Sequence, residues 1–356
     1  MIKFHSLTVR DKQQETPDSV RIALDVRSAD REVFDFLPGQ HLPIQIEREG
    51  KKLRRTYSIC SEPGRWPLEI GVRIQSGGQF SEFVANELSP GDRLDVMPPN
   101  GQFHAVVDAA NEKRYLALAA GSGITPILSI VAALLRDEPL SKVTLFYGNR
   151  KQNSTMFIDD LFALKNRYPA RFQLHFLFSQ EEQEFEISSG RLDDAKVREL
   201  YRHFCADVAP DDVFVCGPDT MIKTVTATLV DLGLAADTIH AERFGAPRGK
   251  GAVKTVAAAG SKDLSQVTVI LDGHKKSFDM QRSGTNIVDA AASNGIELPY
   301  SCKGGVCATC RTHVQSGEVA MATNYGLEPW EVKDGFVLAC QCTPVSDAVV
   351  LNYDKV

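Results

Sequence analysis

The sequence of 356 residues lacks the features that define several protein classes. It has no excess of basic residues, because 40 Lys and Arg stand against 46 Asp and Glu, and the net charge of −6 gives no global field to gather nucleic acid. Eight Cys are too few for a disulfide framework in a chain of this length. The first residues lack the charged-then-apolar pattern of a signal peptide, and no internal repeat is present. We therefore expect a cytoplasmic, globular, multidomain protein that binds neither nucleic acid nor a membrane.

One uncharged run is long enough to imitate a membrane span. It extends from Tyr115 to Leu135, and about 20 apolar residues suffice to cross a bilayer. Gly121, Gly123 and Pro126 interrupt it, and such residues are typical of a turn. The run therefore predicts a buried strand followed by a helix.

The pattern of the chain changes three times. Residues 1–110 carry short β-rich runs separated by Pro-Gly turns, which predict a barrel or sandwich. Residues 111–245 alternate strand-like and helical stretches, which predict an α/β doubly wound parallel sheet with ligands beyond the carboxyl ends of its strands. Residues 246–262, rich in Gly, Ala and Lys, predict a flexible linker. Residues 263–356 begin with a hairpin signal at Asp272-Gly273 and form a third domain.

The strongest chemical signal is a cluster of cysteines in the third domain. Cys302, Cys307 and Cys310 have the C-x4-C-x2-C spacing of plant-type [2Fe–2S] ferredoxins, and a distant Cys completes the set. A structural zinc site is the alternative, but zinc sites usually pair two C-x2-C knuckles. Periodicity does not choose between Cys340 and Cys342 as the fourth ligand. Gly304 and Gly305 are expected to let the loop wrap closely, with N–H groups directed at sulfur.

Four further motifs are weak when each is taken alone. They are Arg55-Thr56-Tyr57-Ser58, Gly77-Gly78-Gln79-Phe80-Ser81, Gly121-Ser122-Gly123-Ile124-Thr125-Pro126 and Cys216-Gly217-Pro218. A packed Tyr57, an N-cap at Ser81, a helix start at Pro126 and a buried Cys216 are the structural alternatives. Cys60 and Cys205 are assigned to packing alone.

In this order, the motifs resemble the ferredoxin–NADP reductase superfamily with a C-terminal plant-type ferredoxin domain. The resemblance implies an antiparallel β-barrel that binds FAD, a doubly wound parallel sheet that binds NAD(P), and an α+β β-grasp domain that holds [2Fe–2S]. It also implies that Cys340, rather than Cys342, is the fourth cluster ligand.

The resemblance further implies roles for individual residues. Tyr57 stacks on the flavin, Ser58 faces its N5 atom, and Arg55 pairs with the pyrophosphate. The first turn at Gly77, Gly78 and Ser81 contacts phosphate. The loops at 121–126 and 216–218 form the nicotinamide pocket, with Cys216 near the reactive carbon. Glu242 and Phe244 belong to a closing strand, where an aromatic ring lies near the flavin.

The nucleotide preference is less clearly marked. Arg150 and Arg191 are candidate partners for a 2′-phosphate, although each also suits solvated surface. Gln180 departs from the Ser-Arg pair of related NADP enzymes. The family favours NADPH, and NADH stays open.

Over its whole length the chain resembles the reductase subunits of phenylacetyl-CoA epoxidase. The likeness is carried by residues 5–9, 37–42, 147–150, 239–244 and 319–325. It implies electron transfer from NADPH through FAD and [2Fe–2S] to di-iron oxygenase subunits, in aerobic phenylacetate degradation. The reductase of another Rieske or di-iron oxygenase is the alternative, and a non-catalytic redox sensor is a third reading. Residues 263–356 hold 11 acidic and seven basic residues, a net charge of −4 that suits a basic docking patch.

Overall fold

The computed structural model describes residues 4–48, 50–205, 207–245 and 264–355. The chain forms two compact units, of which the larger comprises His5–Leu53 and Tyr57–Phe244. The smaller comprises Gly245–Val356 together with Arg54–Thr56 and the first four residues. The linker predicted at 246–262 lies outside the described residues. Among the residues that the structure describes, no helix is long and apolar enough to cross a membrane.

A six-stranded antiparallel sheet forms the first part of the larger unit. Its order is β4-β3-β6-β1-β2-β5. The strands are β1 (His5–Thr16), β2 (Ser19–Asp25), β3 (His41–Arg48), β4 (Lys51–Ser58), β5 (Leu68–Arg73) and β6 (Arg93–Val96). Ile59, which directly follows β4, bridges Ile70 of β5, and the Cys60 N–H donates to the Glu69 carbonyl at 2.8 Å. The sheet therefore closes on itself as the expected barrel, and α1 (Gln79–Asn86) packs Phe80 and Val84 into its core.

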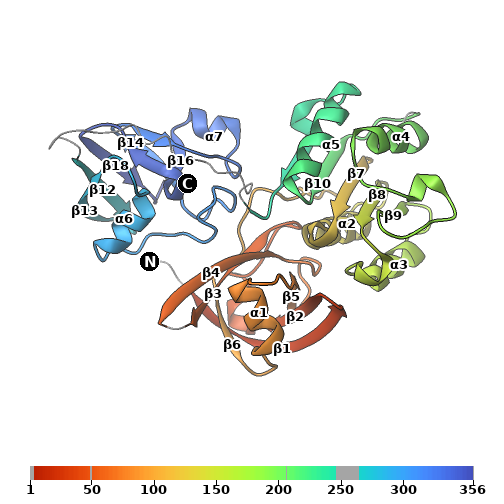
Figure 1. Cartoon of the computed structure of the whole chain (residues 1–356), viewed down its shortest axis with the longest axis horizontal. Coiled ribbons are helices and arrows are strands. Elements are labelled where there is room, and N and C mark those ends of the chain that lie inside the picture. The colour runs from red at the N-terminus through yellow and green to blue at the C-terminus, as the bar shows by residue number, and fades with distance from the viewer. Residues whose placement is uncertain (1–3, 49, 206, 246–263, 356) are drawn as a thin grey trace. The chain divides into compact units, whose positions relative to one another are not determined.

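A five-stranded parallel sheet forms the second part of the larger unit, with the order β11-β10-β7-β8-β9. The strands are β7 (Arg114–Ala120), β8 (Lys142–Asn149), β9 (Phe172–Phe178), β10 (Asp212–Cys216) and β11 (Ile239–Glu242). The helices are α2 (Ile124–Asp137), α3 (Ile158–Arg167), α4 (Asp194–Phe204) and α5 (Asp219–Asp231). Helices cover both faces of this sheet (Figure 1). Alternate residues of β7 face opposite cores: Ala117 belongs to the core that contains residues of α2, and Leu118 to the core that contains residues of α5. The predicted doubly wound sheet is confirmed, and the uncharged run splits into β7 and α2.

The order of the parallel strands reverses between β7 and β10. From β7 the chain proceeds outward through β8 and β9, and it then returns to place β10 and β11 on the other side. Ligands of open α/β sheets bind at such a switch point, beyond the carboxyl ends of the strands. The two glycine loops that follow β7 and β10 lie at this point.

An ion-pair cluster joins the barrel to the parallel-sheet part of the larger unit. Arg21 of β2 pairs with Asp160 of α3 and with Glu15 of β1, the latter at 3.1 Å between Nη2 and Oε2. Glu15 also accepts a hydrogen bond from the Phe157 N–H at 2.8 Å. Phe157, the N-cap of α3, adopts a φ of 58°, which a bulky residue rarely occupies. The contacts of Glu15 and Arg21 hold this start of α3 against the barrel.

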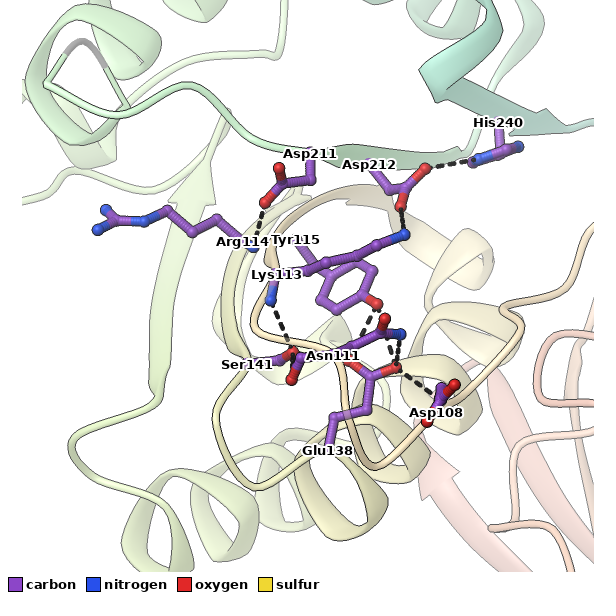
Figure 2. A network of polar contacts seen from close by, with 10 residues as sticks. All are labelled: Asp108, Asn111, Lys113, Arg114, Tyr115, Glu138, Ser141, Asp211, Asp212 and His240. Atoms are coloured by element: carbon purple, nitrogen blue, oxygen red, sulfur yellow. Dashed lines mark hydrogen bonds and ion pairs between the residues drawn. The ribbon is translucent and has the colours of Figure 1, made fainter.

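A second polar network lies at the amino end of the parallel sheet (Figure 2). Its centre is Glu138, the C-cap of α2, whose side chain is fully buried. The carboxylate accepts hydrogen bonds from the Tyr115 and Ser141 hydroxyls, the Asn111 amide and the Asp108 N–H, at 2.7–3.1 Å. Burial and the hydrogen bond to Glu138 raise the pKa of Tyr115. The network ties the segment that enters β7 to the end of α2.

Replacing Glu138 with Ala should destabilise the protein, because the substitution leaves several buried donors without an acceptor. We expect a loss of roughly 2–4 kcal/mol in the free energy of unfolding. Denaturation of the full chain, followed by circular dichroism, measures this change. Glu112, an exposed carboxylate of the same connecting segment, provides the matched control. Glu112→Ala should stay within about 0.5 kcal/mol of the wild type; equal losses in both variants would contradict the role of the network.

The smaller unit is an α+β domain built on a mixed sheet, as expected of a β-grasp domain. The order is β13-β12-β18-β14-β16, in which β12 and β18 run parallel and the other pairs antiparallel. The strands are β12 (Leu264–Leu271), β13 (His274–Gln281), β14 (Arg311–Ser316), β16 (Phe336–Leu338) and β18 (Ala348–Asn352). A two-stranded sheet, β15 (Val319–Met321) with β17 (Cys342–Pro344), and the helices α6 (Ile287–Ser293) and α7 (Pro329–Lys333) complete the domain. The predicted hairpin turns at Asp272 and Gly273, both at positive φ.

Candidate functional site

The loops that follow β7 and β10 touch through their backbones. A Cβ atom on Gly123 would lie 2.2 Å from the Cys216 carbonyl oxygen and 2.8 Å from the Gly217 nitrogen. Only glycine permits this approach. Gly217 is also confined, because its Cβ would lie 3.0 Å from the Met221 sulfur. The two motifs that the sequence separates by about ninety positions therefore form one surface at the switch point.

Local hydrogen bonds shape the first of these loops. Gly121 adopts a φ of 54°, and its carbonyl accepts a hydrogen bond from the buried Tyr147 hydroxyl at 2.9 Å. The Thr125 hydroxyl donates to the Ser122 carbonyl at 3.0 Å. Pro126 stands in the first turn of α2, where a missing N–H leaves no intrahelical hydrogen bond unmade. Pro218 likewise precedes α5 directly, as its N-cap.

Cys216 packs as an interior side chain at the end of β10. It is fully buried within the core shared with α2, which matches the structural alternative for this residue. Burial, reinforced by the negative charge of Glu242, raises the pKa of the thiol well above its ordinary value. The thiol is therefore neutral at physiological pH, and its predicted place beside the nicotinamide stays a prediction.

A hollow of about 360 Å³ lies beyond β8 and β9, lined by Lys151, Gln152, Asn153 and Glu181. Arg150 is exposed directly before it. The Glu181 carboxylate accepts a hydrogen bond from the Gln152 N–H at 2.7 Å. Arg191 is exposed as well, but the lining of the hollow does not include it. Lys151, which no sequence motif marks, adds a second basic residue here.

The predicted flavin residues Arg55, Tyr57 and Ser58 lie on β4 and differ in their burial. Tyr57 is half-buried, and its ring packs at 5.1 Å, centroid to centroid, from that of Phe80 on α1. Ser58 is buried, whereas Arg55 is exposed and donates to the neighbouring Arg54 carbonyl. Tyr57 is thus a packed aromatic, as its structural alternative states, and it stands beside the helix predicted to contact phosphate.

The Ser58 side chain meets a carboxylate from the other sheet of the larger unit. Glu242, the last residue of β11, lies with one oxygen 3.4 Å from the Ser58 hydroxyl and the other 3.4 Å from His41 Nδ1. Sequence reasoning assigns no role to His41, since a lone His matches no motif. Its Nε2 atom is buried and has no hydrogen-bond partner. Phe244 lies two residues beyond β11 and is half exposed.

The first turn of α1 differs from its structural alternative, an N-cap at Ser81. Gly78, and not Ser81, is the N-cap, and the Ser81 hydroxyl bonds within the loop, to Gln75 and Gly78. The Gly77 N–H donates to the Glu82 carboxylate at 2.7 Å, and the Gly78 N–H donates to the Gln75 carbonyl. The N–H groups at the start of the helix, at Gln79, Phe80 and Ser81, have no intrahelical acceptor and are the donors suited to phosphate.

The cysteine loop brings its thiols together two by two. Cys302 and Cys307 exchange backbone N–H···S hydrogen bonds at 3.4 Å, and Cys310 lies beside Cys340, because the Ala339 N–H donates to the Cys310 carbonyl at 3.2 Å. The bond from Cys307, helped by backbone N–H groups, lowers the pKa of Cys302 to about 5. The neighbouring Cys310 thiol lowers the pKa of Cys340. The four cysteines with plant-type spacing therefore lie in two neighbouring parts of one domain, as the ferredoxin spacing predicts.

The backbone of the loop turns through residues in the left-handed region. These are Lys303, Gly305 and Ala308, with φ between 50° and 73°, so only one of the two expected glycines has this conformation. The Gly304 N–H donates to Cys302 Sγ at 3.3 Å, which is one of the N–H···S contacts expected of the two glycines. Such hydrogen bonds tune the reduction potential of a cluster.

The structure distinguishes Cys340 from Cys342. Cys340 lies in a short 3₁₀ turn beside Cys310, so the two residues do not share a strand face as periodicity assumes. Cys342 begins β17 and is fully buried, and burial raises the pKa of its thiol to about 12. Cys340 therefore lies beside another predicted ligand, whereas Cys342 lies in the strand that follows. The choice of Cys340 as the fourth ligand stays a prediction.

Comparison with protein families divides the chain into three. Residues 6–105 match the oxidoreductase FAD-binding domain, residues 117–227 the oxidoreductase NAD-binding domain, and residues 269–345 the 2Fe-2S iron-sulfur cluster binding domain. The solved structure of phthalate dioxygenase reductase covers 98% of both chains with a TM-score of 0.58 at 24% identity, and it shares the fold.

Two relatives extend the comparison over the full length. A subunit of 1,2-phenylacetyl-CoA epoxidase from Escherichia coli (strain K12) is 42% identical over 354 residues, 99% of each chain. The ferredoxin reductase component of 3-ketosteroid-9-alpha-monooxygenase from Rhodococcus rhodochrous is 31% identical, over 98% of this chain and 96% of its own.

Fold, cysteine pairs and domain matches define an NAD(P)H-dependent flavin and iron–sulfur oxidoreductase. Its cofactors are FAD, NAD(P)H and a [2Fe–2S] cluster, a set that divides the electron pair of one hydride into single electrons. Electrons pass from NAD(P)H through FAD to the cluster. Within the ferredoxin reductase superfamily, the chain belongs to the family that includes this 1,2-phenylacetyl-CoA epoxidase component of Escherichia coli.

Replacing Cys340 with Ala should abolish the cluster, because one iron loses a thiolate ligand. Cys342→Ala is the matched control, since it removes a buried thiol two residues away without removing a ligand. Iron and sulfide content, with the visible spectrum, measures the difference, and FAD content verifies that both variants fold. Cluster loss in Cys342→Ala with retention in Cys340→Ala would reverse the assignment.

The raised pKa of Cys216 predicts how flavin reduction responds to pH. A free thiol has a pKa of about 8.5, and a thiol whose pKa is raised above this value stays neutral at all lower pH values. Its contribution to folding stability is lost only when the pH rises above about 8.5. Single-turnover flavin reduction should therefore follow the same pH profile between pH 6 and 8.5 in the wild type and in Cys216→Ala. An ionisation in that range that disappears in the variant would show a reactive thiolate instead.

Proposed function

We propose that this chain is the reductase component of a phenylacetyl-CoA epoxidase and passes electrons from NADPH to its di-iron oxygenase subunits. The observation that carries the proposal is the 42% identity to the Escherichia coli epoxidase component over 99% of both chains. Identity to the 3-ketosteroid monooxygenase reductase is 31% and supports the broader class of oxygenase reductases.

In this proposal the larger unit receives the hydride and the smaller unit sends single electrons to the partner. Tyr57 and Ser58 hold the flavin ring, and Glu242 orients the Ser58 hydroxyl that it contacts at 3.4 Å. The switch-point loops, which include Gly123, hold the nicotinamide. The first turn of α1 and Arg55 hold the pyrophosphate, and Phe244 lies near the flavin. The domain limits at residues 110, 245 and 262 are part of the same proposal.

The NADPH preference is supported by Arg150 and Lys151 beside the hollow that follows β8. A 2′-phosphate favours Arg or Lys, whereas a free 2′-hydroxyl favours a carboxylate. The carboxylate in the hollow, Glu181, is already engaged by the Gln152 N–H. We therefore propose that the two basic side chains receive the phosphate.

Reconstitution with the purified oxygenase core of phenylacetyl-CoA epoxidase tests the proposed partner. Epoxide formed from phenylacetyl-CoA only when this protein and NADPH are present is the expected result, and NADH run in parallel measures the nucleotide preference. Oxidation of NADPH with reduction of cytochrome c, but without epoxide, would retain the reductase and assign it to another Rieske or di-iron oxygenase.

Replacing Cys310 with Ser separates the two redox centres. Electrons that need the cluster should stop, so cytochrome c reduction and epoxide formation should fall to background. Direct reduction of ferricyanide by the flavin should survive near the wild-type rate. Equal loss of both activities would indicate misfolding of the whole chain instead of an interrupted path.

Turnover with the oxygenase should depend on ionic strength, because the acidic last quarter of the chain is proposed to meet a basic surface. Raising salt from about 50 to 500 mM shortens the Debye length from about 14 to 4 Å and slows electrostatically steered association. Rates measured at sub-saturating oxygenase should fall severalfold, while ferricyanide reduction changes little. A salt-independent rate would contradict charge-assisted docking.

A further inference from the structure

Helix α7 of the smaller unit exposes two large apolar side chains. Trp330 is 62% exposed and Val332 is 41% exposed. The chain contains only two Trp, and the other, Trp66, packs partly buried against the barrel core. Trp is the residue most enriched among those that dominate the binding energy of protein interfaces. An exposed Trp on an ordered helix is therefore a candidate anchor.

The helix that carries Trp330 is held firmly from beneath. Glu331 is fully buried, and its carboxylate accepts a hydrogen bond from Arg311 Nε at 2.6 Å. The Arg311 guanidinium also lies over the Phe336 ring at 3.6 Å. A capping box between Glu328 and Glu331 closes the first turn. Trp330 thus projects from a rigid base, which lowers the entropy that a partner must remove on binding.

The same ion pair connects α7 to the cysteine loop. Arg311 directly follows the cluster ligand Cys310 in the chain, and Glu331 is the neighbour of Trp330. One hydrogen bond and two chain steps therefore link the exposed indole to a ligand of the electron-releasing centre. Because electron transfer slows steeply with distance, an acceptor protein must bind close to these ligands.

We propose that Trp330 and Val332 form the docking anchor for the electron-accepting oxygenase, which would supply an apolar pocket with basic groups at its rim. The basic rim follows from the net charge of −4 over residues 263–356 and from Glu328, exposed beside Trp330. This assignment rests on the proposed function. It adds the residues that the partner recognises.

The test compares Trp330→Ala with the wild type in turnover by the epoxidase oxygenase core. Loss of a central Trp costs about 2 kcal/mol or more, so the half-saturating oxygenase concentration should rise about thirtyfold or more. Ferricyanide reduction and electron transfer from flavin to cluster, followed by stopped flow, should stay unchanged. Phe185→Ala, which removes a 65% exposed aromatic from the larger unit, is the matched control and should leave half-saturation unaltered. Trp330→Phe should retain most of the affinity.

Fluorine NMR gives a readout that does not depend on activity. Labelling this chain with 5-fluorotryptophan yields two resonances, and Trp66→Phe assigns them. Unlabelled oxygenase core should shift or broaden the Trp330 resonance alone.

The outcomes separate this inference from the function on which it rests. Unaltered half-saturation in Trp330→Ala, or slowed flavin-to-cluster transfer with unaltered half-saturation, overturns the anchor alone. A wild-type protein that reduces ferricyanide but drives no epoxide formation overturns the proposed partner, and the anchor for that partner with it.

Discussion

The backbone contact between Gly123 and Cys216 is the constraint on which the nucleotide-binding half depends. Strands β7 and β10 are neighbours in the sheet, and the loop after β7 can reach the backbone at Cys216 only if residue 123 carries no side chain. This contact brings a helix start and a strand end to one place at the switch point. From there β11 carries Glu242 to Ser58 of the barrel, which is the residue proposed to face the flavin.

The cysteine loop must also bring distant groups together, and it does so through backbone hydrogen bonds to sulfur. Four sulfurs must come together at the cysteine loop, which has little regular structure to position them. Backbone N–H groups serve instead, because each hydrogen bond to sulfur both fixes the loop and favours the thiolate. The positive φ of Lys303 and Ala308 shows that the loop adopts conformations that its residue types do not favour.

The sequence was informative wherever a pattern reflects a local physical requirement. Strand alternation, Pro-Gly turns and the Asp272-Gly273 hairpin depend on neighbouring residues, and the three-domain fold followed from them. The cysteine spacing predicted the cluster for the same reason. Contacts between distant segments could not be read in this way: His41 meets Glu242 across about 200 positions, and no local pattern marks it. The N-cap at Gly78 was missed because Ser81 has the side chain that caps prefer, whereas the backbone geometry decides.

The network around Glu138 and the glycine loops after β7 and β10 occupy opposite ends of the same sheet. The length of β7 therefore separates the Glu138 network, which stabilises the fold, from the glycine loops, which are proposed to bind the nucleotide. Substitutions that retune nucleotide choice at the carboxyl edge do not draw on the hydrogen bonds that secure the amino edge. Such a domain can change its electron donor over evolutionary time without first acquiring compensating stability.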